Sequence, residues 1–284
     1  MPGFRRILVC WGGAASNAGL LLYARALTAL TPPPEFVFLH VMREAFGSPQ
    51  QAAEAQVRRL EQLREVAERD AAPEGATRCV VRLGEPLDEI LLHAAEICAD
   101  AILLGHDPRR RGRRSLARRF AAAAPCAVWM VPNGAAARIG RVLAAFDLSA
   151  SSAAAVRSAA AIAGSAGLSE IHLLHVRQSS SPRSEDDLQR FVATLNLRPL
   201  SVRLMVEDGE TVGRAIVQTA ARLAADLVVV GARGQNPSAA VLLGAETEQT
   251  LRESSVPVFV VRPDSGQLPL LNALLDDRTA AGKT

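Results

Sequence analysis

Three glycines in the stretch GARGQNPSAAVLLGA, residues 231–245, have the type and spacing to bind an anion. Gly231, Gly234 and Gly244 follow the apolar run ADLVVV, which predicts a strand, and precede a stretch with helical character. Glycine lets a backbone approach a ligand closely, and a helix N-terminus favours a negative charge. The stretch therefore predicts a phosphate-binding loop, although a plain strand-to-helix turn would use the same residues.

A second charged feature is a run of arginines in the first half of the chain. Its members are Arg109, Arg110, Arg111, Arg113, Arg114, Arg118 and Arg119. Such a run could bind a phosphate-bearing ligand, an acidic protein partner or nucleic acid, and it could equally be a solvated basic loop. Phe120 is the only aromatic residue beside the run, so nucleic acid is the least favoured of these partners.

Two histidines near the ends of apolar runs invite an acid–base interpretation. His40 lies in FVFLHV and His175 lies in IHLLHV. Neither has a nucleophile beside it in the sequence, so we interpret both as packed or hydrogen-bonded structural residues. The sequence also lacks HExxH and GxSxG motifs, and we expect no catalytic residue and no metal ligand set.

The composition favours two well-packed domains in a compartment that keeps thiols reduced. The 284 residues are enough for two domains of about 140 residues, and 49% of them are hydrophobic. The net charge of +3 does not indicate general nucleic-acid binding. Four widely spaced cysteines without a CxxC pair predict a cytoplasmic protein. The apolar runs are too short to span a membrane, so we expect no membrane association.

The two halves of the chain repeat one another in five blocks. RRILVCWGGAAS resembles GRVLAAFDLSAS, and FVFLHV resembles IHLLHV. GEPLDEIL, ADAILLG and CAVWMVP are followed in the second half by GETVGRAI, ADLVVVG and VPVFVVR. The spacing differs only between blocks, where loops would lie. The repeat predicts an internal duplication, with domains at 1–133 and 138–263 and a C-terminal tail at 264–284.

Each half has five short apolar runs separated by stretches with helical character. One such stretch is SNAGLLLYARALTAL, with Ser16 as its expected N-cap. Continuous apolar strands are typical of a parallel sheet covered on both faces. We therefore predict an α/β fold of two tandem, doubly wound, parallel five-stranded sheets of Rossmann-like type. The fifth strands, AVWMV and VFVV, would lie at sheet edges and could pair to form an intramolecular pseudo-dimer, with a further homodimer left open.

In such a sheet, ligands bind beyond the carboxyl ends of strands where the strand order reverses. In the second half, the loop after the first strand begins with Asp147, and the loop after the fourth strand contains the three glycines. At these residues the chain resembles the universal stress protein family, in its tandem form, over residues 5–263. The family pattern is Gly, two residues, Gly, nine residues, Gly, then Ser or Thr, and Gly231, Gly234 and Gly244 fit both spacings.

The resemblance implies an adenine nucleotide, ATP, ADP or AMP, with or without Mg²⁺, in the second domain. It implies that Ala145 and Asp147 contact adenine or ribose and that Val176 lines the base. The residues that would approach the sugar and the phosphates are Val230, Gly231, Gly234, Gly244 and Ala245.

Ala245 departs from the family pattern, which has a hydroxyl at this position. Alanine cannot donate a hydrogen bond to a terminal phosphate, and such a bond contributes about 1.5–3 kcal/mol. Glu246 follows, and its charge would repel a phosphate if the side chain turned inward. We therefore expect weakened ATP binding or a preference for a less phosphorylated nucleotide.

The first half lacks the corresponding loop. Gly12 stands in place of Asp147, Pro108 replaces the second glycine of the pattern, and Arg114 replaces the third. We interpret this half as a degenerate domain that does not bind ATP. Two hypotheses follow: a stress-response protein that binds an adenine nucleotide with little or no hydrolysis, and a nucleotide-free scaffold whose residues 109–119 bind an acidic partner.

Overall fold

A computed structural model describes residues 4–13, 18–43, 46–71, 77–106, 116–178, 183–234 and 243–262. Ser16, the tail at 264–284 and residues 107–115 therefore lie outside the described residues. The first half contains β1 (Arg6–Cys10), α1 (Ala18–Leu27), β2 (Glu35–Met42), α2 (Pro49–Asp70), β3 (Thr77–Leu83), α3 (Pro86–Glu96), β4 (Ala101–His106), α4 (Leu116–Ala123) and β5 (Ala127–Pro132). The second half contains β6 (Val142–Ala145), α5 (Ala150–Ser165), β7 (Glu170–Arg177), α6 (Glu185–Thr194), β8 (Ser201–Asp208), α7 (Val212–Arg222), β9 (Leu227–Gly231), α8 (Ala245–Glu253) and β10 (Val258–Val261).

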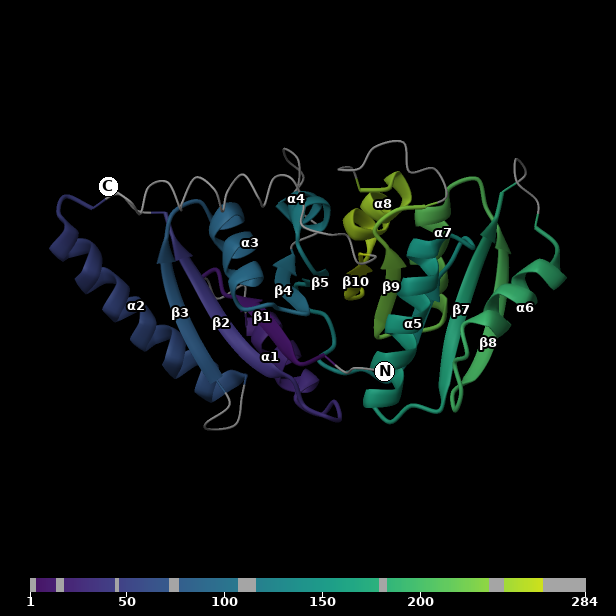
Figure 1. Ribbon diagram of the computed structural model, residues 1–284, viewed down its shortest axis with the longest axis horizontal. Coiled ribbons are helices and arrows are strands. Elements are labelled where there is room, and N and C mark those ends of the chain that lie inside the picture. The colour runs from purple at the N-terminus through teal and green to yellow at the C-terminus, as the bar shows by residue number, and fades with distance from the viewer. Residues whose placement is uncertain are drawn as a thin grey trace.

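The two halves have the same strand order. The order across the sheet is β3-β2-β1-β4-β5-β10-β9-β6-β7-β8, so the second half repeats the order of the first half in reverse. Every pairing within a half is parallel. Figure 1 shows the two halves side by side, with β5 and β10 at the centre. The predicted fold class of two tandem, doubly wound parallel sheets is confirmed.

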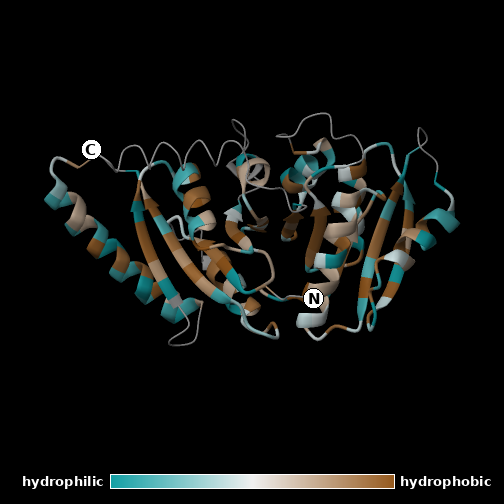
Figure 2. Ribbon diagram, in the orientation of Figure 1, coloured by the Kyte–Doolittle hydropathy of each residue, from teal (hydrophilic) through white to brown (hydrophobic). Residues whose placement is uncertain are grey.

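Two apolar layers cover the sheet, one on each face. Helices α1, α2, α5 and α6 pack on one face, and α3, α4, α7 and α8 pack on the other. The strands between them are almost continuously hydrophobic, whereas α2 is largely hydrophilic, as Figure 2 shows. This pattern is the one expected for a parallel sheet buried on both faces. No helix of the described ranges is long and apolar enough to cross a membrane.

The dipeptide Ala-Asp of the repeat makes the same contact in both halves. The Asp100 carboxylate accepts hydrogen bonds from the backbone N–H groups of Arg5 and Arg6, at 2.7 and 2.8 Å. The equivalent Asp226 accepts one from the Gly140 N–H, at 3.0 Å, and one from the Arg138 guanidinium, at 2.7 Å. Each aspartate thus fixes the chain that enters the first strand of its half next to the start of the fourth strand.

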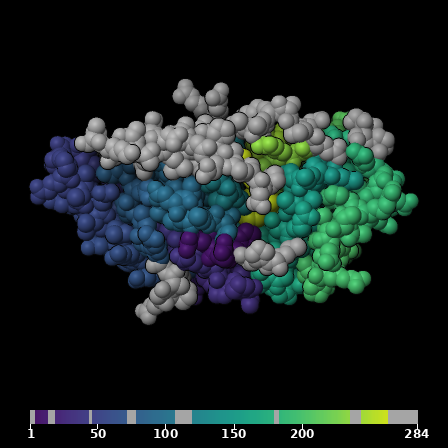
Figure 3. Space-filling view, in the orientation of Figure 1, coloured from purple at the N-terminus to yellow at the C-terminus, as the bar shows by residue number. Residues whose placement is uncertain are grey.

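Antiparallel pairing of β5 with β10 joins the two five-stranded sheets into one ten-stranded sheet. Phe259 lies opposite Trp129, and these residues occupy equivalent positions in the repeat. Their rings lie 4.8 Å apart, and the Phe4 ring lies 5.4 Å from that of Phe259. Both central side chains are buried. The two halves therefore form the expected intramolecular pseudo-dimer, and Figure 3 shows their surfaces next to one another.

Arg262 adds a polar contact across the same seam. It directly follows β10, and its guanidinium donates hydrogen bonds to the carbonyls of Ala121 and Ala122, at 3.3 and 2.5 Å. Both carbonyls belong to the last turn of α4 in the other half, where a helix leaves carbonyls unpaired and favours a positive charge. Arg262 is therefore the C-terminal cap of a helix far away in the sequence.

We expect Arg262→Ala to lower the free energy of unfolding by about 1–3 kcal/mol, because two part-buried carbonyls lose a charged donor. Urea denaturation followed by circular dichroism measures the change. Arg252→Ala is the matched control, since Arg252 is exposed and pairs with its neighbour Glu253. Equal stability of the two variants would show that the cap does not stabilise the seam.

Candidate functional site

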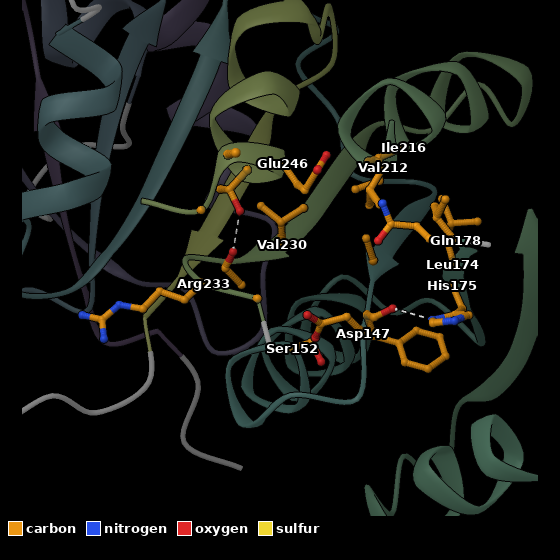
Figure 4. A pocket seen from close by; sticks show the side chains of 18 of the residues that line it. Asp147, Ser152, Leu174, His175, Gln178, Val212, Ile216, Val230, Arg233 and Glu246 are labelled. Carbon is orange, nitrogen blue, oxygen red and sulfur yellow. Dashed lines mark hydrogen bonds between the residues drawn. The ribbon is translucent and has the colours of Figure 1, made fainter. Parts of the chain in front are cut away.

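A pocket of about 600 Å³ lies at the carboxyl ends of β6, β7 and β9, where the strand order of the second half reverses. The beginnings of α5, α7 and α8 complete its walls. Figure 4 shows the side chains of these elements pointing toward a common space. This is the position at which open α/β sheets bind ligands.

The structure brings every nucleotide-site residue predicted from the sequence to this one pocket. The residues are Ala145, Asp147, Val176, Val230, Gly231, Gly234, Gly244 and Ala245. They come from three separate stretches of the chain. The structure shows that these residues lie together, and their contacts with a ligand remain a prediction.

One part of the pocket wall is an apolar slot. Leu174 and Val176 from β7 lie with Val230 from β9 and with Val212 and Ile216 from α7. Four of these five side chains are buried in the core that covers this face of the sheet. Flat aromatic groups bind well to such walls, because binding removes apolar surface from water.

Asp147 holds the turn between β6 and α5. Its carboxylate accepts a hydrogen bond from the Ser149 N–H at 3.0 Å, while Ser149 itself caps α5. Leu148 between them has a φ of 68°, a left-handed conformation that is strained for leucine. A Cβ atom at Gly234 would lie 3.1 Å from the Asp147 carboxylate. The carboxylate is therefore fixed beside the glycine loop.

Packing alone requires a glycine at position 231. A Cβ atom at this position would lie 2.6 Å from Ser151 Oγ and 3.0 Å from the Ser151 backbone, where α5 crosses β9. The backbone of Gly231 is thus in close contact with α5, and its contact with a phosphate remains a prediction. Gly231 still lines the pocket, through its backbone.

The described residues give no such reason for a glycine at position 244. Its φ of −59° suits any residue, and a Cβ atom there would lie no closer than 3.6 Å to the described atoms around it. It lies at the N-cap of α8 and lines the pocket. The described part of the protein would accept a side chain here, whereas a ligand against the backbone would not.

Sequence analysis missed several residues of the pocket wall. They are Phe146, Ser152, Leu174, Gln178, Arg183, Val212, Ile216, Arg233 and Thr247. Thr247 Oγ1 donates to the Gly231 carbonyl at 2.8 Å, which ties α8 to the end of β9. Its place in the first turn after the loop could have indicated it. No spacing in the sequence points to Gln178 or Arg183.

Both histidines are hydrogen-bonded, as predicted, and His175 also lines the pocket. His175 Nδ1 lies 3.1 Å from the Phe146 carbonyl, and His40 Nδ1 lies 2.8 Å from the Trp11 carbonyl. A carbonyl can only accept, so each Nδ1 carries the proton and donates. Burial lowers the pKa of His175, which keeps the ring neutral near pH 7. Each ring also packs on the aromatic residue whose carbonyl it binds.

The arginine run lies almost entirely outside the described residues, which include only the exposed side chain of Arg119. The acidic partner, the nucleic acid and the homodimer therefore stay predictions. Within the described ranges, no group of three or more His, Cys, Asp or Glu residues is arranged to hold a metal ion.

A model of the universal stress protein family matches residues 3–132 and 138–262. A universal stress protein of Archaeoglobus fulgidus is 20% identical over 93% of this chain and 99% of its own, with a TM-score of 0.68. A Pseudomonas aeruginosa protein described as a universal stress protein is 20% identical over 97% of this chain and 98% of its own, with a TM-score of 0.63. A universal stress protein in complex with cAMP covers 44% of this chain and 97% of its own, at 24% identity and a TM-score of 0.36. No curated protein sequence matches significantly.

We expect substitutions of Gly231 and Gly244 to lower stability by different amounts. We expect Gly231→Ala to destabilise the fold by about 1–3 kcal/mol, because the added methyl group meets Ser151. Gly244→Ala should cost about 0.5 kcal/mol, since the added methyl group makes only ordinary contacts. Thermal or urea unfolding of the two variants measures the difference, and equal losses would contradict the distinction.

Proposed function

The chain belongs to the universal stress protein family, and from this premise we propose that its second half binds an adenine nucleotide as a regulatory ligand. The observation that carries the proposal is the convergence of the eight predicted residues on one pocket at the strand-order reversal. The stress response is the process that the family name suggests for this regulation.

The base would occupy the apolar slot of β7, β9 and α7. Val176 and Val230 form its floor, and Ile216 covers it from α7. Asp147 suits the ribose, because a fixed carboxylate accepts hydrogen bonds from sugar hydroxyls. Its place beside Gly234 brings the sugar next to the glycine loop.

The phosphates would lie against the backbone of Gly234 and Gly244, at the N-terminus of α8. The Gly244 N–H already donates to the Ala232 carbonyl, so the N–H groups of the first turn of α8 and the helix dipole would favour an anion there. A Cβ atom at Gly244 would make only ordinary contacts with Ala232, Arg233 and Gly234, so we assign the glycine there to a ligand held against the backbone. Mg²⁺ would accompany the phosphates as a counterion rather than occupy a metal site of the protein.

Binding without turnover is the function that this arrangement supports. His175 is neutral and donates its Nδ1 proton to the Phe146 carbonyl. Asp147 accepts from the Ser149 N–H. Both groups thus have structural contacts, and we assign the site to nucleotide binding with little or no hydrolysis.

Titration of the protein with ATP, ADP, AMP and cAMP by calorimetry, with and without Mg²⁺, tests the proposal. We expect saturable binding that Asp147→Asn weakens about ten- to hundredfold, because one hydrogen bond to a charged group is lost. Asparagine can still accept from Ser149, so the turn should remain. Asp186→Asn is the control, since Asp186 is exposed on α6. Absence of binding up to millimolar nucleotide would rule out the proposal.

Restoring the hydroxyl that the family pattern has at position 245 gives a second test. We expect Ala245→Ser to tighten ATP binding up to about tenfold, because the new hydroxyl donates to a phosphate. Ala245→Val adds bulk without a donor and serves as the control. An equal response to both substitutions would show that position 245 does not contact a phosphate.

A further inference from the structure

The first turn of α8 carries its own negative charges at the point where phosphates would bind. Glu246 and Glu248 both lie in this turn. Glu246 lines the pocket, whereas Glu248 is not among the described residues of its wall. Carboxylates in the first turn compensate the positive end of a helix dipole. Part of the attraction of α8 for an anion is therefore already satisfied by the protein.

The Glu246 side chain also occupies the N-terminus of the neighbouring helix. Its Oε2 atom accepts a hydrogen bond from the Gly213 N–H, in the first turn of α7, at 2.7 Å. Thr211, the N-cap residue of α7, makes no capping bond through its side chain within the described structure. Glu246 therefore supplies the acceptor that this helix needs.

Tight packing keeps Glu246 in this position. A Cβ atom at Gly213 would lie 2.7 Å from the Glu246 carbonyl, so α7 and α8 are in close backbone contact. Thr250 Oγ1 donates to the same carbonyl at 2.8 Å. The carboxylate is thus fixed at the edge of the pocket, and a ligand would meet it there.

Two cations, Arg183 and Arg233, also line the pocket. Figure 4 shows the Arg233 side chain extending away from the other labelled residues. Burial lowers the pKa of Arg262, and the charge of Arg233 lowers it further. Arg183 comes from the segment between β7 and α6.

We propose that Glu246 makes this site selective for adenine ligands with few phosphates, of the nucleoside monophosphate class, over triphosphates. The inference rests on the proposed nucleotide site. Each added phosphate brings negative charge toward the end of the pocket where Glu246 is fixed. Two like charges a few ångström apart in a partly buried site weaken binding about five- to tenfold.

The test compares Glu246→Gln with Glu248→Gln by calorimetry, using adenosine, AMP, ADP and ATP with and without Mg²⁺. Glutamine at 246 keeps an oxygen that accepts from the Gly213 N–H, so the α7 contact should remain. Both variants remove one charge from the same helix turn, and only position 246 faces the pocket. We expect Glu246→Gln to tighten ATP about five- to tenfold, to change adenosine less than twofold, and to exceed Glu248→Gln in its effect on ATP.

The other outcomes separate the two proposals. Binding of adenosine and AMP together with the same ATP response in both variants would overturn the role of Glu246 and leave the nucleotide site standing. If Glu246→Gln weakened ATP binding only when Mg²⁺ is present, Glu246 would be a metal ligand, and this result would also overturn the inference. If none of the ligands bound to the unsubstituted protein or to either variant, the nucleotide site itself would be refuted.

Discussion

Antiparallel pairing of β5 with β10 is the constraint on which the rest of the molecule depends. It gives each half a partner for the strand edge that would otherwise be exposed, and it brings α4 and α8 into contact. The register places Trp129 opposite Phe259, so the pseudo-twofold axis runs through the most bulky part of the core. A shift of either strand by one residue would turn its ring to the opposite face of the sheet from the ring of its partner.

The same pairing connects the candidate loop to the first half through consecutive hydrogen bonds. The Gly244 N–H donates to the Ala232 carbonyl at 3.0 Å, and the Ala232 N–H donates to the Val261 carbonyl at 2.8 Å. The next residue, Arg262, caps α4. The backbone around the glycine loop is thus anchored to the seam rather than to the second half alone, and the geometry of the pocket is a property of the whole chain.

Much of the fold and of the site could be predicted from the sequence, because both depend on patterns along the chain. Apolar runs predicted the strands, the repeat predicted the same succession of strands along both halves, and glycine spacing predicted the loop. The reason for Gly231 could not be found in this way, since Ser151 approaches it from another element. The contacts of Arg262 and Glu246 could not be predicted for the same reason, because the α4 carbonyls and the Gly213 N–H are far away in sequence.

The duplication shows which features the scaffold needs and which the site needs. Both halves keep the histidine that donates to the carbonyl after the first strand, and both keep a left-handed residue in the following turn, Gly13 or Leu148. These features shape the backbone, and they are present whether or not a ligand loop follows. Asp147 has no counterpart in the first half, where Gly12 stands in its place. The left-handed turn costs little with glycine and is strained with leucine. The second half therefore has the less favourable turn, and this turn lies beside the Asp147 carboxylate. A leucine at the left-handed position of the second half is explained if this turn serves ligand binding and not folding.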